Sequence, residues 1–403
     1  MRRFRRWLRL GFFLLIGLLA IGVYAQSDSA TLFTLQDTWE FPVPPDSGIS
    51  YLSINPDKST VLVVYQHQES FNLTDNQKQL FAQTQSELWD MTTRTKIATL
   101  PNETVNIWGA MIDNSGQYIL IQESFTRDNQ RYSLWDAHTG ESIRTIQGHI
   151  TNGTISADGN LFIYFDVPAM TTFVMDISTG DMIAQTDQFA KIWAIGHHPD
   201  QPILALANEV ERPPAYVLFY DVYLWNYATD EVTLIDNTNP SISLSRLIFL
   251  SDPNYLSFHT SGMRFTYDLS QPTYPRVDVI DFRQSTYDRD SYLLSFTADN
   301  LTPPFVGYVY DIITNTRLAT VSEGPIGAAV FFSPDDHYFF GILMSELHQW
   351  DAQTGVHLGM VYFNEFNVGR DVDDFTFTTD GEQLWIFSRV SPIVLIFSAG
   401  KTA

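Results

Sequence analysis

Three aspartates crowd one short segment near the C-terminus. Asp371, Asp373 and Asp374 follow Arg370 directly. Carboxylate oxygens at such spacing are ligands of the kind that Ca²⁺ takes in proteins. The glycine and the terminal glutamate of an EF-hand calcium loop are missing, so the segment matches such a loop only in part. We therefore expect no cofactor, with a Ca²⁺ ion bound by these three aspartates as the alternative.

The chain contains one adjacent pair of histidines, His197 and His198. Because side chains alternate along a strand, one of the two should be packed and the other exposed, and joint metal ligation is not expected. The sequence also lacks a Gly-rich phosphate loop and the G-x-S-x-G elbow of serine hydrolases. No constellation of residues in the sequence predicts catalysis.

The elements that would position any functional residue recur along the chain. The clearest copy spans Tyr132 to His149 and reads YSLWDAHTGESIRTIQGH. An apolar strand there ends on a tryptophan and an aspartate, and a Thr-Gly turn leads into a second strand. A large residue followed by Asp or Asn ends a comparable strand at seven places, 40 to 50 residues apart. These places are Trp89-Asp90, Trp135-Asp136, Met175-Asp176, Trp225-Asn226, Tyr267-Asp268, Tyr310-Asp311 and Trp350-Asp351.

Two kinds of turn separate the strands of each copy. Threonine stands three residues beyond the Asp or Asn in six of the seven copies, and glycine follows that threonine in three of them. The carboxylate can accept backbone N–H groups of the turn, and glycine tolerates the positive φ that reverses the chain. A second turn, such as Asp158-Gly159 or Pro334-Asp335, separates two further apolar strands. Each copy therefore contains four short strands.

These copies resemble WD40 repeats over about residues 37–398, most clearly in copies 2, 3 and 7. The resemblance implies an all-β fold, a single β-propeller of four-stranded blades. One feature departs from the family, whose repeats often link a Gly-His histidine, a hydroxyl and the tryptophan by hydrogen bonds. Only Gly148-His149 matches that dipeptide, and its blade has Met175 in place of the tryptophan. We expect this network to be absent and the blades to depend on aromatic and aliphatic packing.

The strand count predicts how the two ends of the chain meet. Eight units each supply three strands, but only seven outer strands follow them, so the chain is one strand short. Asp37–Pro42 can supply the missing strand and pair beside Ile393–Phe397. Such pairing would close the propeller with an N-terminal strand and cover an exposed sheet edge. We expect eight blades, with seven as the alternative if the compressed sixth unit is not a full blade.

The N-terminal segment indicates export. Residues 1–25 combine five arginines, an apolar run and Val23-Tyr24-Ala25, which is the order of a cleavable signal peptide. The alternative is an uncleaved signal anchor, which would be the chain's contact with a membrane and its transmembrane helix. Residues 26–36 would be a linker and 399–403 a C-terminal tail. We expect a periplasmic or extracellular protein, and since it has no cysteine, its core must be stable without disulfides.

Charge excludes one class of partner. The chain has 23 Lys and Arg against 46 Asp and Glu, a formal net charge of −23, and loss of the five N-terminal arginines would make it −28. Such a field repels nucleic acid and anionic lipid surfaces. We therefore expect no nucleic-acid partner.

Length variation is concentrated in the connections at one end of the strands. Long loops are expected there at Gln66–Glu87, Glu123–Arg131, Asn208–Tyr216 and Asn364–Asp374, and the first of them is polar and rich in Gln and Asn. Long loops on one rim of a rigid scaffold often hold binding residues, although neutral drift produces the same pattern. The candidate binding residues in these segments are Phe71, Phe81, Phe125, Arg131, Phe366 and Arg370.

Two functions from different classes fit these observations. The first is a non-enzymatic, exported or membrane-anchored scaffold that binds a protein or peptide partner on its long-loop face. The alternative is a propeller hydrolase or lactonase that acts on a small molecule or glycan at the mouth of the central channel. Most of the expected innermost strands carry no Asp or Glu, which favours the scaffold. That preference rests partly on analogy with other propellers.

Overall fold

The computed structural model describes most of the chain after residue 32. The described residues are 33–42, 47–67, 85–101, 106–126, 129–189, 191–212, 217–240, 244–250, 252–260, 263–281, 287–288, 292–296, 307–311, 316–321, 329–335, 337–343, 346–363, 374–378, 380–388 and 391–399. Within them there is no helix with the length and apolar character that crossing a membrane requires. The predicted signal peptide or anchor lies outside the described residues.

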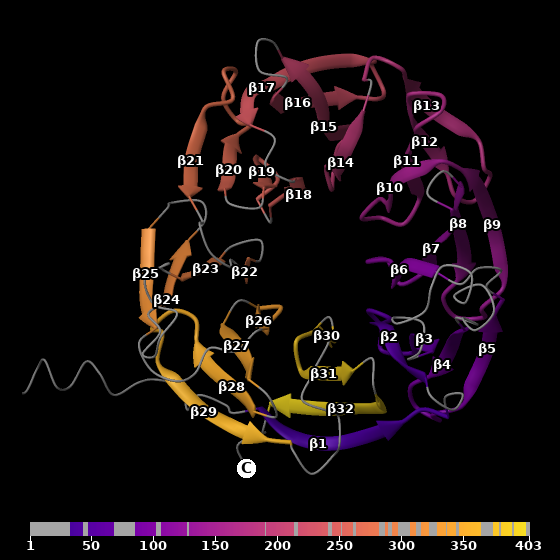
Figure 1. Cartoon of the computed structure of the whole chain (residues 1–403), viewed down its shortest axis with the longest axis vertical. Helices are drawn as coiled ribbons and strands as arrows, with labels where there is room; N and C mark the ends of the chain where they lie inside the picture. Colours follow the sequence, from indigo (N-terminus) through magenta and orange to yellow (C-terminus); the bar gives the residue numbers. More distant parts are fainter. Residues whose placement is uncertain are drawn as a thin grey trace, which may run out of the picture.

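The described strands form eight four-stranded antiparallel sheets, arranged as blades around a ring (Figure 1). The innermost strands are β2 (Ser47–Ile54), β6 (Asn106–Ile112), β10 (Ile150–Ile155), β14 (Ile192–His197), β18 (Leu244–Phe249), β22 (Tyr287–Asp288), β26 (Ala329–Phe332) and β30 (Asp374–Phe377). The second strands are β3 (Thr60–His67), β7 (Tyr118–Thr126), β11 (Leu161–Asp166), β15 (Ile203–Arg212), β19 (Tyr255–Thr260), β23 (Tyr292–Phe296), β27 (Tyr338–Leu343) and β31 (Gln383–Ser388).

The outer half of each blade completes the sheet. The third strands are β4 (Gln85–Asp90), β8 (Asn129–Asp136), β12 (Thr171–Asp176), β16 (Val217–Asn226), β20 (Met263–Asp268), β24 (Gly307–Asp311), β28 (Glu346–Asp351) and β32 (Ser391–Ala399). The outer strands are β5 (Lys96–Leu100), β9 (Ser142–Gly148), β13 (Met182–Thr186), β17 (Glu231–Pro240), β21 (Arg276–Asp281), β25 (Thr316–Val321), β29 (His357–Tyr362) and β1 (Phe33–Glu40). The prediction of eight blades is confirmed, because the compressed sixth unit also has four strands.

The predicted pairing of the two ends of the chain is confirmed. The eighth sheet has the order β1-β32-β31-β30, and β1 runs antiparallel to β32 with Thr38 opposite Leu395 and Trp39 opposite Val394. The strand begins at Phe33, four residues before the predicted start at Asp37. Phe33 is buried and meets the ring of Phe340 in blade 7 edge-on, with centroids 5.2 Å apart. This apolar contact explains why the strand reaches into the segment that we expected to be a linker.

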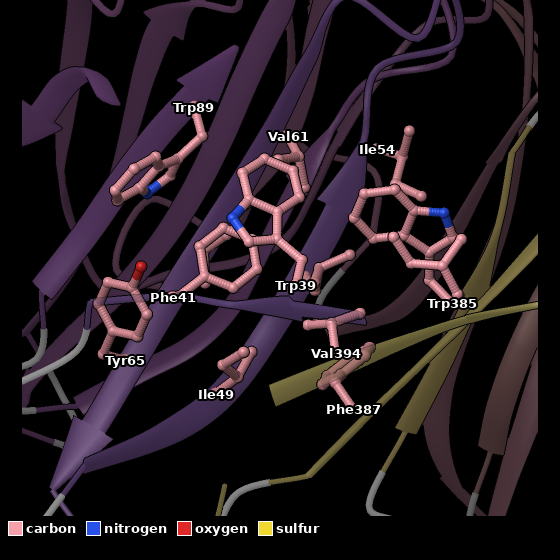
Figure 2. Packing of buried hydrophobic residues seen from close by; sticks show 13 residues of the cluster. Trp39, Phe41, Ile49, Ile54, Val61, Tyr65, Trp89, Trp385, Phe387 and Val394 are labelled. Carbon is pink, nitrogen blue, oxygen red and sulfur yellow. The ribbon is translucent and has the colours of Figure 1, made fainter. Parts of the chain in front are cut away.

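An aromatic cluster joins blades 1 and 8 behind this pairing. Trp39 of β1 stacks on Phe41, with centroids 4.4 Å apart, and meets Trp89 and Trp385 edge-on. Figure 2 shows Trp39 between the tryptophans of the two blades. Aromatic pairs in these geometries stabilise beyond the area that they bury. The strand from the N-terminus therefore packs into the core as well as completing a sheet.

Blades pack through alternating faces of their strands. Val61 and Val63 of β3 face the cluster shared with blade 8, whereas Leu62 and Val64 face blade 2. Successive side chains of a strand point to opposite faces, so both faces of a blade's second strand must be apolar. This requirement explains why the second strands read as continuous apolar runs.

The turns after the third strands have the predicted aspartate geometry. Asp136 Oδ1 accepts hydrogen bonds from the backbone N–H groups of His138 and Thr139 at 2.9 and 2.8 Å, and Gly140 has a φ of 70°. Asp90, Asp176 and Asp351 make the same contact with the residue three positions on. Asn226 replaces aspartate in blade 4 and accepts two longer bonds, of 3.1 and 3.3 Å.

These turns predict an acid-dependent contribution to stability. Hydrogen bonds from Thr93 lower the pKa of Asp90, and hydrogen bonds from Ser178 and Thr179 lower that of Asp176, from an ordinary value of 3.8. The contribution of each carboxylate is therefore present above that value and is lost as the pH falls through the lowered folded-state pKa. An asparagine in place of the aspartate keeps an oxygen that accepts these hydrogen bonds, as Asn226 does in blade 4, but its side chain does not titrate.

We expect the Asp90→Asn/Asp176→Asn double variant to lose less stability than the wild type between about pH 5 and about pH 2.5. Melting temperatures followed by circular dichroism across this range measure the difference. Equal losses in the two proteins would contradict a role for these carboxylates.

Candidate functional site

All long connections leave the blades from one end, which we call the loop end. In blade 1, Ser47 at the start of β2 lies opposite His67 at the end of β3. At the other end of the blades, the turns between first and second strands contact one another. Asn55 Nδ2 in blade 1 donates to Gly116 O in blade 2 at 2.9 Å, and Lys58 in blade 1 pairs with Asp380 in blade 8. Blades 1, 2 and 8 therefore have the same orientation. The strand ends that flank residues 68–84 and 364–373 therefore share one face, and those two segments themselves lie outside the described residues.

Most of the predicted site residues also lie outside the described residues. These are Phe71, Phe81, Phe366, Arg370, Asp371 and Asp373. Phe125 belongs to β7 and Asp374 begins β30. Within the described residues, no group of three or more His, Asp or Glu side chains is placed to hold a metal ion. The Ca²⁺ site at the three aspartates stays a prediction.

Two predicted loops are mostly strand. The segment expected as a loop from Glu123 to Arg131 continues β7 to Thr126 and resumes at Asn129 in β8. In blade 4, β15 and β16 stay paired out to Arg212 opposite Val217. Both hairpins extend because their residues continue the cross-strand hydrogen bonding and alternate facing sides. The prediction of long loops in these two segments was wrong.

Arg131 is the predicted site residue whose contacts are known, and it lies in a buried ion pair. Its Nη2 and Nε atoms lie 2.6 and 2.7 Å from Glu123 Oε2, and both side chains are at least nine-tenths buried. Ser133 donates to the same oxygen at 3.1 Å. Glu123 and Arg131 lie directly opposite each other on the paired strands. The register shift between Ser124 and Thr126 puts the two residues at unequal distances from the turn, so counting along the sequence would not have paired them. The buried pair indicates a structural role for Arg131.

Polar contacts of this kind occur in other blades as well. In blade 1, Glu87 is 4% exposed and accepts hydrogen bonds from Trp89 Nε1 at 3.1 Å and from Lys96 Nζ at 2.9 Å. Trp225 Nε1 donates to Asp230 at 3.0 Å in blade 4. We expected aromatic and aliphatic packing without a buried polar network. Local carboxylates instead take the indole N–H groups of these blades, in place of a histidine network.

Bulges recur near the loop end of the innermost strands. The pairing with the second strand skips Ser50, Trp108, Trp193 and Ser245 in blades 1, 2, 4 and 5. In blade 3, two residues, Asn152 and Gly153, oppose one. Bulges of this kind redirect a side chain and are over-represented beside functional sites. The repeated position makes the loop end of the innermost strands the candidate site.

Trp193 is the most informative of the bulged residues. It is 45% exposed on β14, although tryptophan is among the largest apolar side chains. The ammonium of Lys191 lies 5.3 Å from the centre of its ring and pairs with Glu209, which is 8% exposed. Asn208 Oδ1 accepts the backbone N–H of Lys191 at 3.0 Å. Glu209 and Asn208 thus hold Lys191, two residues before Trp193, in place.

Blade 3 also contacts the segment that leads into Trp193. Asn152 adopts a left-handed conformation, with a φ of 56°, and its Nδ2 donates to the carbonyl oxygen of Ile192 at 2.9 Å. The N–H of Gly153 donates to the hydroxyl of Tyr132 at 3.1 Å, and burial raises the pKa of that phenol to about 12. A Cβ at Gly153 would lie 2.6 Å from the Tyr132 ring, so only glycine fits. These contacts tie blade 3 to the backbone just before Trp193.

Of the two adjacent histidines, one is packed as expected, whereas the other is half-buried and not exposed as expected. His198 is buried, and its Nδ1 accepts the backbone N–H groups of Asp200 and Gln201 at 3.1 Å each. His197 is half-buried, with Nε2 3.4 Å from the Tyr227 hydroxyl. Burial lowers the pKa of both imidazoles. Both lie at the turn end of blade 4, away from Trp193.

The innermost strands carry few acidic residues. Asp288 in β22 and Asp374 in β30 are their acidic residues within the part of the chain that the structure describes. A hydrolase of the kind considered above needs several carboxylates or histidines gathered at the centre of the ring. The contacts of the described side chains bring no such group together at the loop end.

The Glu123–Arg131 pair yields a prediction about stability. Removing one partner leaves the other charge buried, so Glu123→Gln and Arg131→Met should each cost about 3–5 kcal/mol of unfolding free energy. A Glu123→Leu/Arg131→Met double variant should cost less than either single change, because no charge is then left uncompensated. Urea unfolding followed by fluorescence measures the three values. Costs that simply add would show that the pair is not a unit.

Comparisons with known proteins show similarity in fold. No protein-family model matches the chain, and no curated protein matches it. Among solved structures, it is similar to the computationally designed Ika8 protein, with a TM-score of 0.58 and 16% identity over 88% of this chain and 96% of that one. It is also similar to the C-terminal WD40 domain of Sif2, with a TM-score of 0.57 and 14% identity over 92% of this chain and 99% of that one. The fold of this chain is a WD40-like β-propeller of eight blades.

Proposed function

We propose that the protein is a non-enzymatic scaffold that binds a protein or peptide partner at the loop end of its innermost strands. The long connections and the recurring bulges meet at this end. Loops on a rigid frame are the usual place for binding residues. The similarity to WD40 and designed propellers concerns the fold, so the binding function rests on the site itself.

The exposed indole of Trp193 is the observation that carries the proposal. Tryptophan is enriched among the few residues that supply most of the binding energy in protein interfaces. Most other exposed large apolar residues of the described chain lie on outer strands or in turns: Ile97, Met170, Met182, Ile183, Leu234, Leu318, Val356, Met360 and Tyr362. Trp193 and Met111 are exposed on innermost strands. Trp193 lies at the loop end, where a partner would meet it first.

The surroundings of Trp193 favour an apolar anchor residue in the partner. Lys191 is already paired with Glu209, so the charges next to the indole are balanced. An aromatic, aliphatic or proline side chain that stacks on the indole would remove apolar surface from water without breaking that pair. The net charge of −23 also favours partners that are neutral or basic.

We also propose that this scaffold acts outside the cytoplasm. The basic and apolar order of residues 1–25 supports export, by a cleaved signal peptide or with the segment kept as a membrane anchor. A cysteine-free chain folds in an oxidising compartment without the risk of wrong disulfides.

Selection of peptides from a random display library against the full chain tests the binding proposal. The enriched peptides should bind the wild type, and Trp193→Ala should weaken that binding by at least about tenfold, as expected for an interface hot spot. Leu234→Ala is the matched control, because Leu234 is also 45% exposed but lies on the outer strand β17. Melting temperatures confirm that both variants are folded. Peptides that bind wild type and Trp193→Ala equally, or no enrichment at all, would refute the proposal.

A further inference from the structure

Blade 7 brings a second group of chemically active side chains together, far from Trp193 in the fold. Glu346, His348 and Trp350 alternate along β28 and therefore share one face of that strand. In the pairing with β29, Tyr362 lies opposite Glu346, Met360 opposite His348 and His357 opposite Trp350. Directly opposed residues of an antiparallel pair project from the same face. Two histidines, a methionine, a glutamate and a tyrosine thus share a small area.

The two imidazoles meet through their ring nitrogens. His348 Nδ1 lies 3.1 Å from His357 Nε2. The other nitrogen of His348, Nε2, lies 2.9 Å from the carboxylate of Glu346. A carboxylate accepts only, so Nε2 carries the proton and the neutral imidazole has its lone pair on Nδ1.

This arrangement is the one that metal-binding histidines use. A ligating imidazole usually donates its second N–H to a carboxylate, which fixes the tautomer and raises the basicity of the ligating nitrogen. For metal–nitrogen bonds of about 2.05 Å, two ligands stand about 2.9 Å apart at a right angle and about 3.3 Å apart at the tetrahedral angle. The 3.1 Å between His348 Nδ1 and His357 Nε2 lies between these values.

Met360 identifies the kind of metal. Its side chain is 41% exposed and lies directly across the strand pair from His348. A thioether is a soft ligand that favours copper, and Cu⁺ in particular, whereas zinc and the hard cations do not select it. His348 itself is 2% exposed, whereas Met360 and Tyr362 on the neighbouring strand β29 are 41% and 61% exposed. An ion could enter from the side of these two exposed residues.

We propose that His348 Nδ1, His357 Nε2 and the Met360 thioether form a copper site, with Glu346 orienting His348. Binding needs the proton of His357 on Nδ1, which frees its Nε2 for the metal. In the metal-free protein the two imidazoles share a hydrogen bond instead. The site belongs to the outer half of blade 7, and it is independent of the proposed binding function at the loop end.

Competition with a chromophoric chelator tests the site. Under anaerobic conditions, the full chain should withdraw one equivalent of Cu⁺ from its bicinchoninate complex. His357→Gln should weaken the affinity by at least about 100-fold, and Met360→Leu and Glu346→Gln by about tenfold each. Met360→Leu should leave Zn²⁺ affinity unchanged within about twofold, because zinc does not depend on the thioether. In aerobic samples, Cu²⁺ should also quench Trp350, whose ring centroid lies 5.0 Å from that of His357.

Two control variants separate this site from adventitious copper. Met182→Leu changes a methionine of similar exposure on the outer strand of blade 3, and His138→Gln removes a surface histidine in blade 2. Both should bind Cu⁺ as the wild type does. If the wild type withdraws no Cu⁺, or if His357→Gln and Met360→Leu bind it as tightly as the wild type, the site is refuted and the two imidazoles form only a hydrogen bond. Met360 is exposed, so its variant remains informative even if His357→Gln fails to fold.

Discussion

The pairing of β1 with β32 is the interaction on which the rest of this fold depends. Each of the first seven blades takes its four strands from one continuous stretch, whereas the eighth combines β30, β31 and β32 with the N-terminal strand β1. Without β1, β32 would present a row of unpaired N–H and C=O groups and an apolar surface. The N-terminal strand covers that edge and adds Trp39 to the core between blades 1 and 8. Contacts between residues more than 300 positions apart thus hold the two ends of the chain together.

The packing that stabilises this propeller is separate from its loop end. The blades pack through both faces of their second and third strands, and the aspartate turns lie at the end away from the long connections. Polar groups buried near the loop end, such as Glu87 and the Glu123–Arg131 pair, have partners within their own blades. The bulged innermost strands at that end expose Trp193 without disturbing the packing. Sequence changes in the connections can therefore alter the loop end while the sheets stay intact.

The repeat in the sequence predicted the fold well, because turn residues and alternating strands are local signals. Blade number and the N-terminal strand followed from counting them. The boundaries were less predictable: β1 starts at Phe33 because of a contact with Phe340, which is remote in sequence. The site was harder still. Length variation between the repeats suggested a loop at Glu123–Arg131, where the structure has a buried ion pair. The exposure of Trp193 was not predicted, because a bulge depends on the register with the neighbouring strand.

The most direct test of this account is the register between β1 and β32. The chain has no cysteine, so an engineered pair can be followed without background. Thr34 lies opposite Ser398, whereas Gln36 lies in the register shift of β1 and has no partner on β32. Under mild oxidation, Thr34→Cys/Ser398→Cys should form an intramolecular disulfide in the native monomer, and Gln36→Cys/Ser398→Cys should not. Equal cross-linking of the two pairs, or none in either, would contradict the pairing on which the propeller depends.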